Sequence, residues 1–215
     1  MRRAFELVCT LIGLVVLWPI FLVVAVAIKL EDGGPVFYAH PRVGRNFRRF
    51  RLLKFRSMVS GADRRGGAVT SKGDPRITKV GRVLRKYKLD ELPQLLNVLK
   101  GEISLVGARP EVERYVNLFR PQYEEILAER PGITDPATLA FRNEEELFTG
   151  DDVEGLYLEE ILPRKLELSL EYGRRRTFFS DLVILFRTVL KLPSGREKPE
   201  KPENLTLPRG PRVTR

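Results

Sequence analysis

The chain contains one cysteine, one histidine and one tryptophan among its 215 residues. A single cysteine cannot form an internal disulfide, and Cys9 and His40 alone cannot complete a zinc site. The G-x-S-x-G turn of a serine hydrolase is absent too, so a hydrolase triad would have to be built around His40 alone. Hydrophobic residues make up 43% of the chain, which excludes disorder throughout. The length therefore suits one compact domain with a sizeable core.

Charge is unevenly distributed along the chain. Residues 29–110 contain 19 Lys and Arg against 7 Asp and Glu, whereas residues 111–173 contain 6 against 16. Residues 174–215 are basic again, with 11 against 4. A basic block of this size is typical of proteins that bind phosphate groups, whether in nucleic acid, in lipid headgroups or in a phosphorylated substrate.

Residues 7–28 form an uncharged run rich in Leu, Val and Ile that is long enough to span a bilayer as a helix. Trp18 and Pro19 stand at its midpoint, where proline kinks a helix. Both flanks are basic, and the positive-inside tendency favours keeping both in the cytoplasm. We therefore expect a re-entrant membrane helix over residues 1–30 that is broken at Trp18-Pro19. A simple transmembrane anchor is the alternative.

The rest of the chain predicts an α+β, mostly α-helical domain over residues 31–191. Short strands are expected at 36–39 and 47–55 and would form a β-hairpin. Helices are expected at 80–88, 92–100, from Arg109 onward, at 163–175 and at 177–190. The last has an apolar side and follows three arginines, a pattern typical of a helix at a membrane surface, although a core helix shows it too. Residues 192–215 are expected to be extended or disordered.

Asp90 and Glu91 stand together at the start of a predicted helix, followed by Pro93. Two acids at this position can simply cap the helix and complement its dipole. Their basic surroundings favour another interpretation, because carboxylates among cations suit a site that holds phosphates together with Mg²⁺. A carboxylate can also attack phosphorus and form an acyl phosphate. The basic residues around the pair are Arg82, Arg85, Lys86, Lys88, Lys100 and Arg109.

Seven short sequence blocks follow one another along the chain. They are residues 34–37 (GPVF), 42–44 (RVG), 54–58 (KFRSM), 74–81 (DPRITKVG), 89–95 (LDELPQL), 97–110 (NVLKGEISLVGARP) and 130–134 (RPGIT). These blocks follow an apolar helix that is broken by a proline. In this combination the chain resembles the monotopic phosphoglycosyl transferases, which form the bacterial sugar transferase family. The resemblance runs from about Arg3 to Lys191.

The resemblance implies transfer of a sugar phosphate from a UDP-sugar to polyprenyl (undecaprenyl) phosphate with release of UMP, the first membrane step of glycoconjugate biosynthesis. Asp90 would be the nucleophile that forms a phosphosugar-aspartate, and Glu91 would hold Mg²⁺. The residues expected to bind the substrate phosphates are Lys54, Arg56, Arg85 and Arg109. The resemblance also implies a monotopic protein of the bacterial inner (cytoplasmic) membrane, in contact with its lipid, with the catalytic domain facing the cytoplasm. The oligomeric state is open, with a homodimer among the alternatives.

Three positions depart from the usual family pattern. Ala108 stands where proline is common, residues 135–138 (DPAT) stand where many members have Gly-Trp-Ala-Gln, and Ser169 stands where an acid often precedes Tyr172 by three residues. The segment after Thr134 is thought to face the sugar nucleotide in this family. The further residues expected to bind substrate are Thr134, Asp135, Arg142 and Tyr172.

Two other classes of function are consistent with parts of the sequence. A membrane-tethered nucleic-acid binder would explain the basic block, but few aromatic residues stand among its arginines to stack on bases, and we expect no nucleic acid partner. A catalytically silent scaffold of the same fold would explain the membrane helix. The intact Asp90-Glu91 pair argues against the scaffold. The sequence does not identify the sugar.

Overall fold

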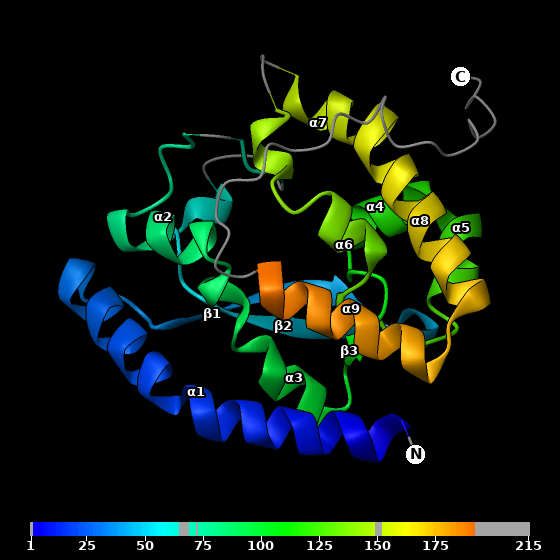
Figure 1. Ribbon diagram of the computed structural model, residues 1–215. Coiled ribbons are helices and arrows are strands. Elements are labelled where there is room, and N and C mark those ends of the chain that lie inside the picture. Colours follow the sequence, from blue (N-terminus) through cyan, green and yellow to red (C-terminus); the bar gives the residue numbers. More distant parts are fainter. Residues whose placement is uncertain (1, 65–68, 72, 149–151, 192–215) are drawn as a thin grey trace.

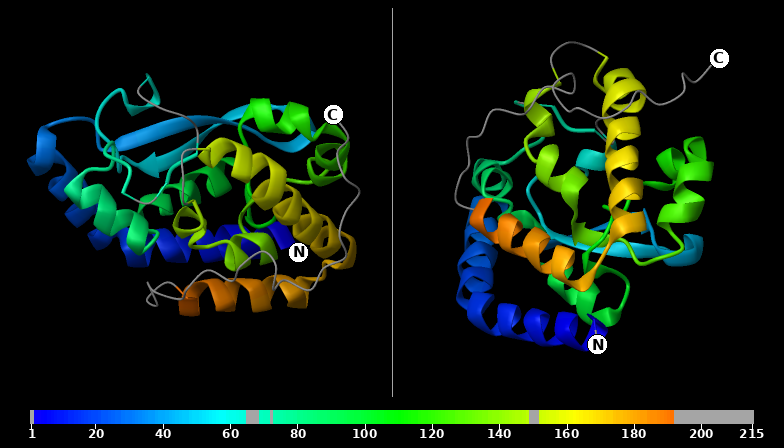
Figure 2. Two further views of the ribbon diagram at one scale, coloured as in Figure 1. Left: turned by 90° about the horizontal axis from the view of Figure 1, so that it is seen from above. Right: turned by 45° about the vertical axis from the view of Figure 1, so that its right-hand side comes forward.

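The computed structural model of the chain describes residues 2–64, 69–71, 73–148 and 152–191, so the predicted tail at 192–215 lies outside it. Helix α1, Arg2–Asp32, runs along one side of the molecule and bends near its middle (Figure 1, Figure 2). Pro19 lies inside this helix, where its ring and missing N–H disturb the backbone ladder. The apolar helix expected at residues 1–30 is therefore present and ends two residues later, at Asp32.

Within the described residues, α1 is the one helix that is long and apolar enough to cross a membrane. Most of its large side chains face outward, with Trp18 61% exposed. The other exposed apolar residues of α1 are Val8, Leu11, Ile12, Val15, Val16, Ile20, Leu22, Val23, Val26 and Leu30. An exposed apolar surface of this size indicates that α1 contacts a further apolar environment.

The predicted β-hairpin is present, and both of its strands are seven residues long. Strand β1, Phe37–Val43, pairs antiparallel with β2, Arg49–Phe55, so that Phe37 lies opposite Phe55 and Tyr38 opposite Lys54. A short 3₁₀ turn, η1, Arg45–Phe47, joins them. Strand β1 continues through Pro41, beyond the predicted end at residue 39, because proline is tolerated in a strand with a free edge.

The predicted helices are found, with shifted ends for some of them. They are α2 (Lys79–Lys86), α3 (Gln94–Lys100), α4 (Glu113–Leu118), α8 (Leu162–Arg175) and α9 (Phe178–Lys191). Three further helices were not predicted, namely α5 (Arg120–Ile126), α6 (Pro136–Ala140) and α7 (Val153–Leu156). Short turns complete the described elements: the 3₁₀ turns η2 (Ala62–Arg64), η3 (Leu89–Glu91) and η4 (Glu144–Glu146) and the π-helical turn η5 (Tyr157–Ile161). The helix expected from Arg109 onward begins at Glu113 instead.

A second, parallel strand pair was not expected. Strand β3, Ser104–Val106, pairs with β4, Gly132–Thr134. The backbones approach closely beyond it, where Gly132 N donates to Ala108 O at 2.8 Å. A side chain at Gly107 or Gly132 would collide with the other strand's backbone, which explains both glycines.

Acidic residues at the end of α1 attach this helix to the rest of the protein. Glu31 accepts hydrogen bonds from the backbone N–H groups of Lys79 and Val80 at 2.7 and 3.2 Å and so caps α2. Asp32 forms an ion pair with Arg56 at the end of β2. Below them, Phe55 packs with Val24, Ile28 and Leu84 in a buried cluster. The orientation of the second half of α1 is therefore set by both polar and apolar contacts.

Helix α9 lies on the same side of the molecule as the first half of α1, and the rings of Phe5 and Phe178 meet edge to face at 5.3 Å. One side of α9 covers β3 and β4 and contains the buried residue Ile184. The opposite side exposes Phe179, Val183, Phe186, Val189 and Leu190. The apolar face predicted from the sequence is thus present, on a helix whose first residue, Phe178, contacts α1.

Candidate active site

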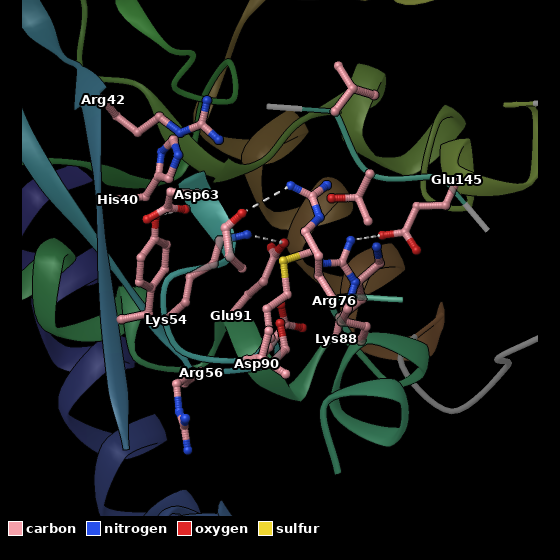
Figure 3. A pocket seen from close by; sticks show the side chains of 18 of the residues that line it. His40, Arg42, Lys54, Arg56, Asp63, Arg76, Lys88, Asp90, Glu91 and Glu145 are labelled. Atoms are coloured by element: carbon pink, nitrogen blue, oxygen red, sulfur yellow. Dashed lines mark hydrogen bonds and ion pairs between the residues drawn. The ribbon is translucent and has the colours of Figure 1, made fainter. Parts of the chain in front are cut away.

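A cavity of about 420 Å³ opens between the hairpin, the turn η3 and the segment that follows β2. The alternation of side chains along β1 directs Tyr38, His40 and Arg42 into it, and Lys54 enters from the facing position on β2. Asp90 and Glu91 enter from η3, and Arg109 enters after β3. Figure 3 shows His40 and Arg42 at one end of this cavity and Glu145 at the other, with Asp90 and Glu91 between them.

Glu91 is held from two sides. Arg109 donates through both terminal nitrogens, Nη1 to Oε2 at 3.0 Å and Nη2 to Oε1, a two-pronged pair. Lys54 Nζ donates to Oε1 at 3.4 Å. The adjacent Asp90 is 5% exposed, and its Oδ1 has no hydrogen-bond partner within the described part of the chain. The two acids therefore differ: Glu91 is fixed by cations, and Asp90 keeps one oxygen available.

Capping does not account for the acids. The residue before η3 is Lys88 and the residue before α3 is Pro93, and neither helix start is capped by a side chain. Lys88 adopts a left-handed backbone conformation with φ of 56°, which costs energy for a residue with a side chain. The strained residue turns the chain immediately before η3, two positions ahead of Asp90.

The pKa values of the two carboxyl groups shift in opposite directions. Burial raises the pKa of Asp90, and the nearby negative charge of Glu91 adds to this effect against the opposing charge of Lys54. Burial alone would raise the pKa of Glu91 as well, but Arg109 and Lys54 together hold it well below its usual range. Lys54 itself has a lowered pKa, chiefly because it is buried. The site therefore keeps Glu91 ionised while making the charge on Asp90 costly.

The donor set fits Mg²⁺ as part of a complex with a diphosphate. Mg²⁺ binds one or two protein carboxylates and takes substrate phosphate oxygens and water for the rest of its shell. Asp90 Oδ1 is buried and unpartnered within the described residues, and the Glu91 oxygens retain lone pairs beside their cations. Among the described residues there is no group of three or more Asp, Glu, His and Cys side chains that could hold an ion alone. The substrate would therefore have to supply ligands.

The four predicted phosphate ligands differ in their neighbours and in their distance from the acid pair. Lys54 and Arg109 lie against the Asp90-Glu91 pair. Arg85 lines the same cavity and is paired with Glu145. Arg56 borders the cavity, but its guanidinium extends away from Asp90 and Glu91 (Figure 3) and pairs with Asp32, and a side chain at Gly34 would overlap it.

A second cavity, of about 280 Å³, lies on the other side of Glu91. Its walls are mostly apolar and are contributed by Leu17, Leu92, Leu95, Ile133, Leu139 and Phe141. Gly13 and Leu17 belong to α1, so this cavity reaches the long apolar helix. The two cavities share four lining residues, namely Lys88, Glu91, Arg109 and Glu144. A polar and an apolar cavity thus meet at the charged pair of Glu91 and Arg109.

The other predicted substrate ligands divide between this second cavity and the protein framework. Thr134 and Arg142 line the apolar cavity, and Thr134 Oγ1 lies 2.8 Å from the hydroxyl of Thr188 in α9. Asp135 is fully buried and caps α6 by accepting from Thr138 N at 2.7 Å. Tyr172 donates to Asp181 at 2.6 Å, at the junction of α8 and α9. Asp135 and Tyr172 line neither of the two cavities.

Two departures from the family pattern meet in space. Ser169 Oγ donates to Asp135 Oδ2 at 2.6 Å. Asp135, the residue that precedes α6, thus places a carboxylate beside Ser169, and the serine hydroxyl donates to it. The buried carboxylate stays fully hydrogen-bonded, which a buried charge requires.

Sequence reasoning missed several residues of the first cavity. Tyr38, His40, Arg42 and Glu111 line it. Arg42 Nη1 donates to Glu111 Oε2 at 2.9 Å, and Tyr157 donates to Glu111 Oε1 at 2.7 Å. The available signal was the alternation of residues 38, 40 and 42, which a strand continued to residue 43 would have placed on one face.

Comparison with known proteins places this architecture in a family. Residues 1–195 match the family model described as bacterial sugar transferase. The exopolysaccharide production protein ExoY of Sinorhizobium fredii is 36% identical, over 87% of this chain and 83% of its own length. The UDP-glucose:undecaprenyl-phosphate glucose-1-phosphate transferase of Caulobacter vibrioides is 34% identical, over 89% and 69%. The undecaprenyl-phosphate glucose phosphotransferase of Komagataeibacter xylinus is 40% identical over 87% of this chain, which spans 35% of that protein. The chain belongs to the bacterial sugar transferase family, as its sequence blocks predicted.

Proposed function

We propose that this protein transfers a sugar 1-phosphate from a UDP-sugar to undecaprenyl phosphate and releases UMP. The observation that carries the proposal is the meeting of two cavities at Glu91 and Arg109, one polar and one apolar. Such an arrangement suits a reaction between a charged, water-soluble donor and an acceptor with a long apolar chain. The names of the Caulobacter and Komagataeibacter relatives describe this type of transfer for those proteins.

The first half-reaction would take place in the polar cavity. The ionised Asp90 attacks the phosphorus that carries the sugar, a bond forms between the carboxylate oxygen and phosphorus, and the bond to the α-phosphate oxygen breaks. UMP leaves with that oxygen, and the sugar phosphate remains on Asp90 as an acyl phosphate. Burial and the charge of Glu91 raise the pKa of Asp90, so the carboxylate is poorly stabilised and correspondingly reactive.

Cations of the site would orient the diphosphate and stabilise its charge. Arg109 presents a planar fork that suits two phosphoryl oxygens, and Lys54 adds a point charge on the opposite side of Glu91. Glu91 would hold Mg²⁺, which when bound would neutralise charge on the phosphates. Arg85 could join them once its pair with Glu145 opens.

The second half-reaction would use the apolar cavity. Undecaprenyl phosphate enters along α1, where Gly13 and Leu17 contribute to the cavity wall, and brings its phosphate to Arg109 and Lys88. An oxygen of the lipid phosphate attacks the phosphorus on Asp90, and the carboxylate leaves. The product is a polyprenyl diphosphate sugar, and Asp90 is regenerated.

The membrane arrangement belongs to the same proposal. A bend in α1 at a proline, basic flanks and the adjoining apolar face of α9 support a helix that enters one leaflet and returns, with both ends and the catalytic domain in the cytoplasm. Cysteine labelling at residues 2 and 40, with Cys9 replaced by serine, tests this topology. Labelling of the two positions from opposite sides of the membrane would reject it.

The test of the activity is release of UMP from a panel of UDP-sugars, beginning with UDP-glucose, by the full chain in lipid nanodiscs. Release should require both Mg²⁺ and undecaprenyl phosphate for repeated turnover. A single burst of UMP without the lipid acceptor should accompany labelling of the protein. No UMP release with any donor would contradict the proposal, and salt-sensitive nucleic acid binding in its place would favour a nucleic-acid binder.

A further inference from the structure

One end of the polar cavity is not used by the proposed reaction. It is formed by Tyr38, His40 and Arg42, which alternate on one face of β1. His40 is the sole histidine of the chain. The rings of Tyr38 and His40 lie 5.7 Å apart at an angle of 54°. Tyr38 donates its hydroxyl to Asp63 at 2.7 Å, which fixes the position of its ring.

Two buried polar atoms at this end have no partner within the described residues. They are Nδ1 of His40 and Nε of Arg42. A buried polar atom without a hydrogen bond costs free energy, and a ligand that supplies the bond removes this cost. Burial, followed by the charge of Arg42, lowers the pKa of His40 to about 4. The imidazole is therefore neutral near pH 7 and offers one donor and one acceptor without charge.

The two ends of the cavity differ in chemistry, although the β1 end also contains one carboxylate, that of Asp63, which accepts from Tyr38. Lys54 and Arg109 occupy the middle, next to the acid pair. Glu145 lies at the end opposite His40 (Figure 3), and Glu144 belongs to the same turn, η4. Carboxylates accept hydrogen bonds from sugar hydroxyls, whereas a neutral imidazole between an aromatic ring and a guanidinium suits a flat, uncharged heterocycle. In a UDP-sugar the diphosphate separates these two parts.

We propose that Tyr38, His40 and Arg42 form the nucleoside subsite of the donor cavity, in which His40 hydrogen-bonds to the edge of the uracil base. The subsite rests on the proposed function, because it takes a UDP-sugar as the donor. It also orients the donor, with the base on β1, the diphosphate at Lys54 and Arg109, and the sugar toward η4. His40 is thereby a specificity residue that contacts the part of the donor released as UMP.

Nuclear magnetic resonance can test this contact directly, because one histidine gives one set of imidazole signals. The full chain, selectively ¹³C-labelled at histidine and carrying no histidine tag, would be titrated in nanodiscs with UMP and, separately, with inorganic phosphate. UMP should shift the His40 signals, and phosphate at saturating concentration should not. Equal shifts with both ligands would mean that His40 senses only phosphate charge, and no shift with saturating UMP would mean no contact. Either result overturns the subsite.

Kinetics of His40 variants provide a second readout. His40→Leu should raise the donor KM about tenfold, the usual effect of one buried hydrogen bond, and change kcat by less than about twofold. His40→Asn, which keeps a polar atom near the position of Nδ1, should restore part of the affinity. Arg51→Leu is the matched control, since Arg51 is an exposed residue of the same hairpin that lines neither cavity.

The outcomes separate the subsite from the proposed function. UMP release by the wild type together with an unchanged KM in folded His40→Leu and His40→Asn would overturn the subsite alone. Absence of UMP release by the wild type would overturn the proposed function. A fall in kcat without a change in KM would place His40 in the chemistry and would also contradict the assignment. Thermal unfolding of each variant shows which of them are folded.

Discussion

Asp90 and Glu91 are joined by one peptide bond, yet the pKa of the first carboxyl is raised and that of the second is lowered. The difference comes from their partners, because Arg109 and Lys54 contact Glu91, whereas Asp90 Oδ1 is buried without a partner in the described part of the chain. Two neighbouring carboxyl groups whose environments separate their pKa values are suited to different tasks. The pair can therefore combine a fixed anion with a reactive one.

Replacement of Asp90 by asparagine should abolish transfer while stabilising the fold. An amide cannot form the acyl phosphate. Because the pKa of Asp90 is raised in the folded chain, Asp90 loses its proton there at a higher pH than in the unfolded chain. Ionisation of Asp90 therefore lowers the stability of the fold as the pH rises above the ordinary pKa of Asp. At neutral pH the Tm of the variant should therefore rise by about 2–4 °C, the shift produced by about 1 kcal/mol in a chain of this size.

Two measurements check this prediction. A radiolabelled UDP-sugar without lipid acceptor should label the peptide that contains Asp90 in the wild type and leave the variant unlabelled. Calorimetry should show the higher Tm at pH 7 and a smaller difference at acidic pH. Robust turnover by Asp90→Asn, or label on another residue, would contradict the covalent mechanism.

The pH dependence of the first half-reaction should follow the charges around Asp90. The acid limb of kcat/KM for the donor reports the carboxyl that must be ionised. Glu91 raises the pKa of Asp90, so Glu91→Gln should move this limb to lower pH. Lys54 lowers the same pKa, so Lys54→Met should move the limb to higher pH. Shifts of the same sign in both variants would exclude Asp90 as the titrating group.

Arg109→Lys should reduce transfer at least about tenfold although the charge is kept, because the two-pronged geometry toward Glu91 and the phosphates is lost. Arg174→Lys is a matched control, because Arg174 makes a two-pronged pair with Glu125 on the exposed surface. The control should leave both the rate and the stability nearly unchanged, because the pair is exposed to solvent. Steady-state UMP release and thermal unfolding of both variants give the comparison. Equal transfer rates in Arg109→Lys and Arg174→Lys would show that the two-pronged geometry of Arg109 does not contribute to transfer.

The parts of the fold that the sequence predicted well are those with a strong periodic signal. The apolar run of α1, the hairpin and the amphipathic α8 and α9 were all identified within a few residues. The pair of β3 and β4 was missed because strands of three residues are too short to show alternation. Helix α4 begins at Glu113 and not at Arg109, since Arg109 is drawn to Glu91 and residues 110–112 remain extended or irregular.

The candidate site, too, could be predicted from the sequence only in part. Sequence blocks pointed to Asp90, Glu91, Lys54 and Arg109, and the structure brings these four together. No local pattern could reveal that Arg56 pairs with an acid 24 positions earlier. Contacts of this kind depend on how distant segments pack, and a single sequence does not contain that information.

Arg56 should act mainly as an attachment point of α1. Arg56→Ala should lower the free energy of unfolding by about 1–3 kcal/mol, because it leaves Asp32 without its partner and opens space beside Gly34. Asp32→Asn should also lower stability, and the double variant should lose less than the sum of the two. Chemical unfolding of the four proteins measures this coupling. Additive losses, together with a raised donor KM in Arg56→Ala alone, would instead identify Arg56 as a phosphate ligand.

A bulky residue in the apolar cavity should separate the two half-reactions. Leu139 lines this cavity and is absent from the polar one. Leu139→Trp should therefore raise the KM for undecaprenyl phosphate by roughly tenfold or more, since part of the space for the lipid is filled. Labelling of Asp90 by the donor without acceptor should change by less than about twofold, because the first half-reaction uses the other cavity. Leu118→Trp is the control, since Leu118 is 59% exposed and lines neither cavity. Equal losses of labelling and of turnover in Leu139→Trp would show that the two substrates do not occupy separate cavities.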